Sequence, residues 1–161
     1  ILNIKLKLFM EQIFSKLKII TKGEGFTDIT DNLNYFIREY NFNSGILNLT
    51  LLHTSCSLIV NENADPNVLK DLKRYMQSIV PYDYYTSLSK NEEKIFYKHF
   101  QEGKDDMPAH IKTSLTNTSL SLSFQKGYIT LGTWQAVYLW EHRFTKKERI
   151  ANIHIIGEKN I

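Results

Sequence analysis

The chain has 161 residues, the size of one domain, and 42% of them are hydrophobic, which is enough to bury a core. Its formal net charge is only +3, which is too balanced to indicate nucleic-acid binding. No run of 18 apolar residues occurs, so we expect no membrane-spanning helix and no membrane partner. Cys56 is the only cysteine, which excludes an internal disulfide and fits a reducing compartment, so we expect a cytoplasmic protein.

Met10 is a candidate for the native start of the chain. Residues 1–9 are therefore expected to be an extension or a remnant of cloning. Residues 10–161 contain no internal repeat and no linker, so we expect them to form a single domain.

The first half of this domain alternates strand and helix signals. Apolar residues alternate over 13–21, which predicts a strand, and recur at helical spacing from Ile29 to Tyr40, which predicts a helix. Three leucines share one face of the next predicted strand, 46–53, and alternation places His53 on that same face. A further strand is predicted over 57–60.

A second helix is predicted after Asp65-Pro66, where Asp serves as N-cap and Pro occupies the first helical position. Its apolar stripe runs from Val68 to Ile79 at helical spacing, and we interpret the stripe as core packing without a ligand role. Residues 82–107 have no clear period, although 92–100 shows partial helical character. Long irregular stretches inside compact domains are often functional.

The last third is dominated by strand patterns. A short helix beginning at Asp106 precedes predicted strands over 119–124, 128–140 and 150–156, with a hairpin turn at Lys126-Gly127. Together these elements predict a single α+β domain: a largely antiparallel sheet or sandwich with a few helices packed on it.

Four of the five histidines lie in short polar clusters that are spread along the chain, and these four are His53, His99, His110 and His142. Imidazole suits both proton transfer near neutral pH and binding of transition metals. Any one of them alone is more simply explained as a structural histidine. Four together indicate a site that the fold assembles.

Charged residues accompany these histidines. Asp105 and Asp106 precede a helix, where two carboxylates either stabilise the helix dipole or bind a hard cation. Glu141 and Arg143 flank His142, and a guanidinium in such a setting can pair with phosphate. Asp65 and its asparagine neighbours fit a turn and a helix cap, whereas Glu62 is less well explained by structure alone.

The order of the motifs is more specific than any one of them. The sequence contains His53-Thr54-Ser55-Cys56-Ser57, Asn61-Glu62-Asn63-Ala64-Asp65-Pro66, Asp105-Asp106-Met107-Pro108-Ala109-His110, Gly132-Thr133-Trp134-Gln135 and Glu141-His142-Arg143. Taken in this order, they closely resemble the YjbQ family of secondary thiamine-phosphate synthases. The resemblance extends from about Glu11 to Gly157.

The resemblance implies an α+β fold in a homotrimer, with a polar, often metal-occupied pocket near the subunit interface. It implies formation of thiamine phosphate, in which a phosphorylated thiazole displaces pyrophosphate from a pyrimidine diphosphate. We expect a divalent metal, Zn²⁺ or Mg²⁺, and a small phosphorylated or polar ligand. Three imidazoles would favour Zn²⁺, and carboxylates with water would favour Mg²⁺.

On this basis each candidate residue receives an expected role. The metal ligands are expected among His53, His99, His110 and His142, so replacing His142 with Ala should abolish metal binding. The expected catalytic residues are Glu62, Asp106, Glu141 and Arg143. The expected substrate-binding residues are Thr54, Ser55, Asn61, Trp134 and Gln135.

Departures from the family pattern and rival functions remain. Phe100 stands where the family usually has an Asp beside the histidine, which makes a role for His99 less secure. Cys56 stands where the family usually has Ala. A metal-dependent hydrolase and a non-catalytic trimeric small-molecule binding protein need the same kind of polar pocket, so the sequence leaves both open.

Overall fold

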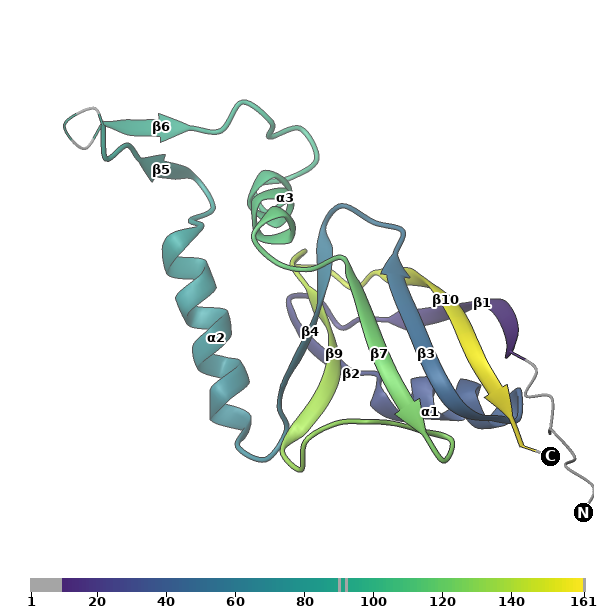
Figure 1. Ribbon diagram of the computed structural model, residues 1–161. Coiled ribbons are helices and arrows are strands. Elements are labelled where there is room, and N and C mark those ends of the chain that lie inside the picture. Colours follow the sequence, from purple (N-terminus) through teal and green to yellow (C-terminus); the bar gives the residue numbers. More distant parts are fainter. Residues whose placement is uncertain (1–9, 90, 92, 161) are drawn as a thin grey trace, which may run out of the picture.

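The structure, a computed structural model, describes residues 10–89, 91 and 93–160. The expected N-terminal extension, residues 1–9, lies outside the described residues. The elements in chain order are β1 (Met10–Ile20), β2 (Gly25–Asp28), α1 (Thr30–Glu39), β3 (Phe42–Leu51), β4 (Cys56–Glu62), α2 (Pro66–Ile79), β5 (Tyr84–Thr86), β6 (Lys94–Phe96), α3 (Asp106–Ser114), β7 (Ser119–Gln125), β8 (Tyr128–Ile129), β9 (Gln135–Glu141) and β10 (Glu148–Lys159). Figure 1 labels all of them except β8.

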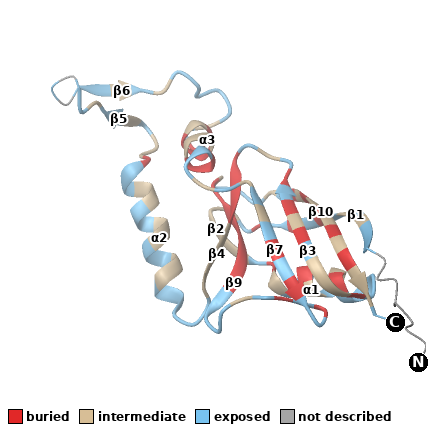
Figure 2. Cartoon of the chain, in the orientation of Figure 1, coloured by how far each residue is buried: buried red, intermediate tan, exposed pale blue. Residues whose placement is uncertain are grey.

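The larger sheet has the strand order β1-β10-β3-β7-β8, and all its neighbours are antiparallel. β10 pairs on both sides, so that Ile153 lies opposite Ser15 of β1 and Leu49 of β3. Alternate residues of β10 are buried, as the banded colouring in Figure 2 shows. This alternation follows from the two-residue repeat of a strand with one face on the core.

The second sheet has the order β2-β9-β4, again antiparallel. β9 lies in its middle, and every residue from Ala136 to Glu141 is buried. One continuous core joins side chains of both sheets to Leu33 and Ile37 of α1. The predicted α+β fold with largely antiparallel sheets is thus confirmed.

The prediction that the apolar stripe of α2 packs in the core is wrong for the single chain. No residue of α2 is buried, and Tyr75 and Ile79 are 67% and 50% exposed. Figure 1 shows α2 standing to one side of the sheets and leading into the projecting β5–β6 hairpin. The predicted N-cap is confirmed, since Asp65 accepts a hydrogen bond from the backbone N–H of Asn67 at 2.8 Å.

Two other predicted elements differ from the structure. The segment 92–100 is not helical in its described part, because Lys94–Phe96 forms β6 and pairs with β5. The predicted strand 128–140 is two strands: β8 extends the hairpin from β7, whereas β9 joins the other sheet. In the described part of the chain, no helix is long and apolar enough to cross a membrane.

Candidate functional site

Two histidines and one aspartate converge where α3 meets the segment that follows β6. His99 Nε2 lies 2.7 Å from Asp106 Oδ2, and His110 Nε2 lies 3.3 Å from the same oxygen. Asp106 and His110 are four residues apart on α3, so they lie on one helix face. One ligand atom of each residue lies within 4.8 Å of the others, and we call the three residues the His–Asp–His cluster.

The hydrogen bonding of His110 determines what its second nitrogen can do. His110 Nδ1 lies 2.9 Å from the carbonyl oxygen of Thr54, and a carbonyl only accepts, so Nδ1 carries the proton. A neutral His110 therefore directs the lone pair of Nε2 toward a carboxylate oxygen. These two acceptors repel unless His110 gains a second proton or a cation lies between them. A backbone carbonyl behind an imidazole is also the usual support for a metal-binding histidine.

Arg143 connects the two aspartates. Its Nε donates to Asp105 Oδ2 at 3.0 Å, its Nη2 donates to the carbonyl oxygen of Glu102 at 2.7 Å, and its Nη1 contacts Asp106 Oδ1. Burial raises the pKa of both aspartates, but the charge of Arg143 and the hydrogen bonds they accept outweigh it, so both pKa values lie below the ordinary value. Asp106 is therefore an anion at neutral pH. The guanidinium is held by protein groups, so Arg143 orients the aspartates in this chain.

Glu141, expected to be catalytic, lies in a separate buried ion pair. Arg149 donates to its two carboxylate oxygens at 2.7 and 2.5 Å, and Thr21 Oγ1 donates to Glu141 Oε2 at 3.0 Å. Arg149 also donates to Ser55 Oγ at 3.0 Å, so Ser55, expected to bind substrate, belongs to this interior network. Glu141 is completely buried. These contacts fix the turn between β3 and β4 against the start of β10.

His142, expected to bind metal, is completely buried and lies outside the His–Asp–His cluster. Its Nε2 lies 2.9 Å from Ser57 Oγ, and its Nδ1 has no hydrogen-bond partner among the described residues. Burial, with a further contribution from the charge of Lys112, lowers the pKa of His142 to about 3. The imidazole is therefore neutral throughout the physiological pH range.

His53 lies beside the cluster without joining it. Its Nε2 accepts a hydrogen bond from the backbone N–H of Ile150 at 2.7 Å, and burial with the nearby Arg149 charge lowers its pKa. His53, Thr54 and His110 line one pocket of about 590 Å³ together with hydroxyl side chains, such as Thr116. Thr54 therefore remains a candidate for substrate binding at the edge of the cluster.

The remaining expected residues lie at the opposite end of the smaller sheet. Cys56 of β4 pairs with Glu141 of β9 near α3, whereas Glu62 pairs with Gln135 six residues further along. At about 3.3 Å per residue this separation is roughly 20 Å. Asn61, Glu62, Trp134 and Gln135 therefore do not meet the His–Asp–His cluster within one chain. Trp134 is 65% exposed.

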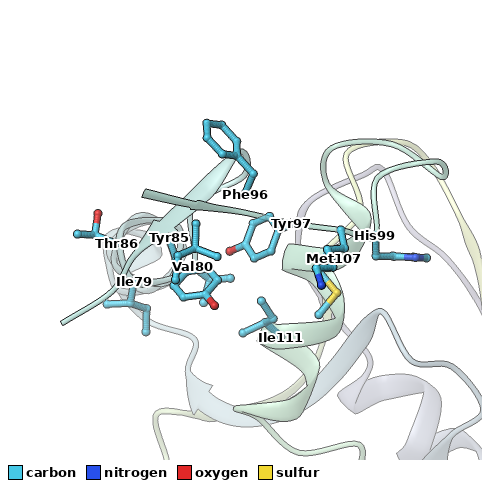
Figure 3. A pocket seen from close by; sticks show the side chains of 11 residues that line it. Ile79, Val80, Tyr85, Thr86, Phe96, Tyr97, His99, Met107 and Ile111 are labelled. Carbon is cyan, nitrogen blue, oxygen red and sulfur yellow. The ribbon is translucent and has the colours of Figure 1, made fainter. Parts of the chain in front are cut away.

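A pocket of about 720 Å³, with His99 among its lining residues, lies between the end of α2, the β5–β6 hairpin and α3 (Figure 3). Its lining is mainly apolar and aromatic, with Tyr97, Met107 and Ile111 facing the space. Lys98 also lines it, and Lys104 lines a neighbouring pocket that His99 shares. The sequence indicated only an irregular segment here, because these residues come from elements without a shared period.

A second polar cluster near α3 was not predicted. Lys112 Nζ donates to Glu24 Oε1 at 2.7 Å and to the Tyr82 hydroxyl at 3.2 Å. Lys112 is only 1% exposed. The sequence carries two signals: Lys112 closely follows His110, and Glu24 lies between two glycines. We call Glu24, Lys73, Gln77, Tyr82 and Lys112 the Glu24 cluster.

Comparison with known proteins agrees with this architecture. The model of the family described as "UPF0047 protein YjbQ-like" matches residues 15–158, so the chain belongs to this family. UPF0047 protein sll1880 of Synechocystis is 38% identical over 142 residues, covering 88% of this chain and 90% of that protein. UPF0047 protein YjbQ of Escherichia coli O157:H7 is 43% identical over 128 residues, covering 79% and 85%.

Solved structures share the fold. A YbjQ-like protein of unknown function from Sulfolobus solfataricus superposes with a TM-score of 0.76 over 93% of this chain and all of that chain, at 19% identity. A conserved hypothetical protein from Thermus thermophilus gives a TM-score of 0.70 at 30% identity, covering 86% of this chain and 97% of that chain.

Proposed function

We propose that the His–Asp–His cluster binds a divalent metal and that the protein uses it to form thiamine phosphate, by displacement of pyrophosphate from a pyrimidine diphosphate by a thiazole phosphate. The observation that carries the proposal is the arrangement of His110, whose Nδ1 is committed to a backbone carbonyl while its Nε2 and Asp106 Oδ2 face each other at 3.3 Å. A cation bound by both atoms would remove their repulsion without a second proton on His110.

The donor set fits a metal. Two imidazoles and one carboxylate are ligands that Zn²⁺ takes in catalytic sites, where a further position stays open. The same set is less suited to Mg²⁺, which prefers oxygen ligands and water. Asp106 is held as an anion, and Arg143 orients it through its other oxygen. When bound, the metal would supply Lewis-acid stabilisation of the negative charge on the departing pyrophosphate.

The surroundings of the cluster fit a phosphorylated ring compound. Lys98 and Lys104 line the two pockets that share His99, and each provides a positive charge for a phosphate group. The apolar and aromatic lining in Figure 3 fits a planar ring. His99 lies between these two environments, so it is the residue that both parts of such a ligand would approach.

The proposal is tested with the purified protein, a pyrimidine diphosphate and a thiazole phosphate, in Zn²⁺ or Mg²⁺ and after treatment with a chelator. We expect thiamine phosphate and pyrophosphate in equal amounts, loss of activity with chelator, and at least a 100-fold lower rate for Asp106→Asn. Asp31→Asn, at an exposed position of α1, is the matched control and should keep full activity. Bound metal without product would reject the synthase function, and phosphate released from one substrate alone would favour a hydrolase.

We further propose that the chain assembles as a homotrimer in which α2 is covered by a neighbouring copy. The support is the apolar stripe of α2, which the described part of the same chain covers only in part: Tyr75 and Ile79 are 67% and 50% exposed. Such a stripe on a stable helix needs a partner surface. Sedimentation equilibrium should give a mass three times the chain mass of 18.9 kDa. The double variant Tyr75→Ser, Ile79→Ser should lower the measured mass toward that of a single chain. A monomeric wild-type protein would reject the trimer.

A further inference from the structure

The Glu24 cluster joins the two parts of the chain that supply the His–Asp–His cluster. His99 comes from the segment beyond α2 and the hairpin, whereas Asp106 and His110 come from α3. Tyr82 lies at the base of the hairpin segment, and Lys112 lies on α3 two residues after His110. Glu24 Oε1 binds both, accepting from the Tyr82 hydroxyl at 2.6 Å and from Lys112 Nζ at 2.7 Å.

The other oxygen of Glu24 binds α2. Gln77 Nε2 donates to Glu24 Oε2 at 2.7 Å, and Lys73 Nζ lies 3.4 Å from the same atom. Lys73 also donates to the backbone carbonyl of Glu24 at 3.1 Å. Because α2 has no buried residue, these polar contacts are a main attachment of the helix to the rest of the chain.

The backbone that precedes Glu24 lies close to Phe144. Gly23 has φ +105°, and a Cβ there would lie 2.2 Å from the carbonyl oxygen of Phe144. The Phe144 ring packs on Tyr82 with centroids 4.7 Å apart, and its N–H donates to Asp105 Oδ2 at 2.8 Å. Phe144 therefore contacts both Tyr82 and Asp105 beside the backbone that precedes Glu24, and Glu24 itself contacts α3 through Lys112.

We propose that Glu24 and Lys112 are positioning residues for the His–Asp–His cluster: their buried ion pair sets the position of α3 relative to the segment that carries His99. This inference rests on the metal site proposed above. A buried lysine and a buried carboxylate contribute little net stability compared with apolar residues of the same size. Their specific effect is to select one orientation of α3, and the separation of the metal ligands depends on that orientation.

The test compares cobalt and zinc binding in the wild-type chain and in the double variant Glu24→Gln, Lys112→Met. The double variant removes both charges, so neither is left buried without a partner, and Met fills the space of the lysine stem. We expect the double variant to unfold at nearly the wild-type urea concentration. Its zinc affinity should fall 10- to 100-fold, the range for residues that support metal ligands. Its visible Co²⁺ spectrum should also shift.

Two further variants keep the test decisive. Lys18→Met with Glu148→Gln removes an exposed ion pair of 3.0 Å on the larger sheet and should leave metal affinity and spectrum unchanged. If the double variant of the Glu24 cluster does not fold, Tyr82→Phe, which removes one hydroxyl and no charge, should still lower zinc affinity. Unaltered affinity and spectrum in the folded variant would overturn the positioning role alone. Absence of metal binding by the wild type would instead overturn the proposed metal site and, with it, this inference.

Discussion

The lowered pKa of the buried His142 imidazole predicts how the free energy of unfolding depends on pH. Its pKa is about 3 in the folded chain and about 6.5 in the unfolded chain. Below about pH 6.5 the unfolded chain takes up a proton that the folded chain does not bind until about pH 3. The free energy of unfolding therefore falls as the pH falls through this range. Because the folded pKa lies far below pH 5, the loss between pH 7 and pH 5 depends mainly on the unfolded pKa. It amounts to about 2 kcal/mol of unfolding free energy at about 1.4 kcal/mol per pKa unit.

The assay is urea unfolding of the wild type and of His142→Gln at pH 7 and pH 5, at one protein concentration. We expect His142→Gln to be less stable at pH 7, because Ser57 loses its partner, and the difference from wild type to shrink by about 2 kcal/mol at pH 5. Ser57→Ala is the matched control: it keeps the imidazole, so its difference from wild type should change little with pH. If His142→Gln loses the same unfolding free energy at both pH values, the conclusion that the folded chain keeps His142 neutral is wrong.

Three further predictions concern the cluster and its supports. Asp106→Asn should lower zinc affinity by at least 100-fold in competition with a chromophoric chelator, whereas His142→Gln should leave it unchanged; the reverse pattern would restore the ligand role expected for His142. Arg143→Met leaves two carboxylates without their cation and should lower the unfolding free energy by about 3–5 kcal/mol, as for other broken buried pairs. A loss below about 1 kcal/mol, as for exposed ion pairs, would contradict the role of Arg143 in holding the two aspartates. Gly23→Ala, at φ +105°, should lower the melting temperature clearly more than Gly132→Ala, whose Cβ would meet only the flexible end of Gln135.

The sequence predicted those features that local periodicity controls. The alternation in β10 and the leucines of β3 follow from one buried sheet face, and the structure places them as expected. Asp106 and His110 could be placed together because a helix brings residues four apart onto one face. Their meeting with His99 depended on the fold of the intervening chain and could be expected only from the polar clustering of the histidines.

The remaining differences have physical causes. Both faces of β9 are covered, so its sequence lacks the apolar–polar alternation that would tell one face from the other. The direction of the His142 side chain, which follows β9, could therefore not be predicted. The stripe of α2 indicated that one helix face is covered, but an amphipathic pattern does not distinguish the same chain from a second copy. Glu24 and Lys112 are 88 residues apart, and no local pattern links them.

The most direct test of the metal site is X-ray diffraction at the zinc absorption edge on crystals of the wild-type protein equilibrated with Zn²⁺. We predict one anomalous peak at the His–Asp–His cluster, about 2.0–2.2 Å from an imidazole nitrogen and from an Asp106 oxygen. A cluster without a peak, or a peak at His142 instead, would contradict the site on which the proposed function depends.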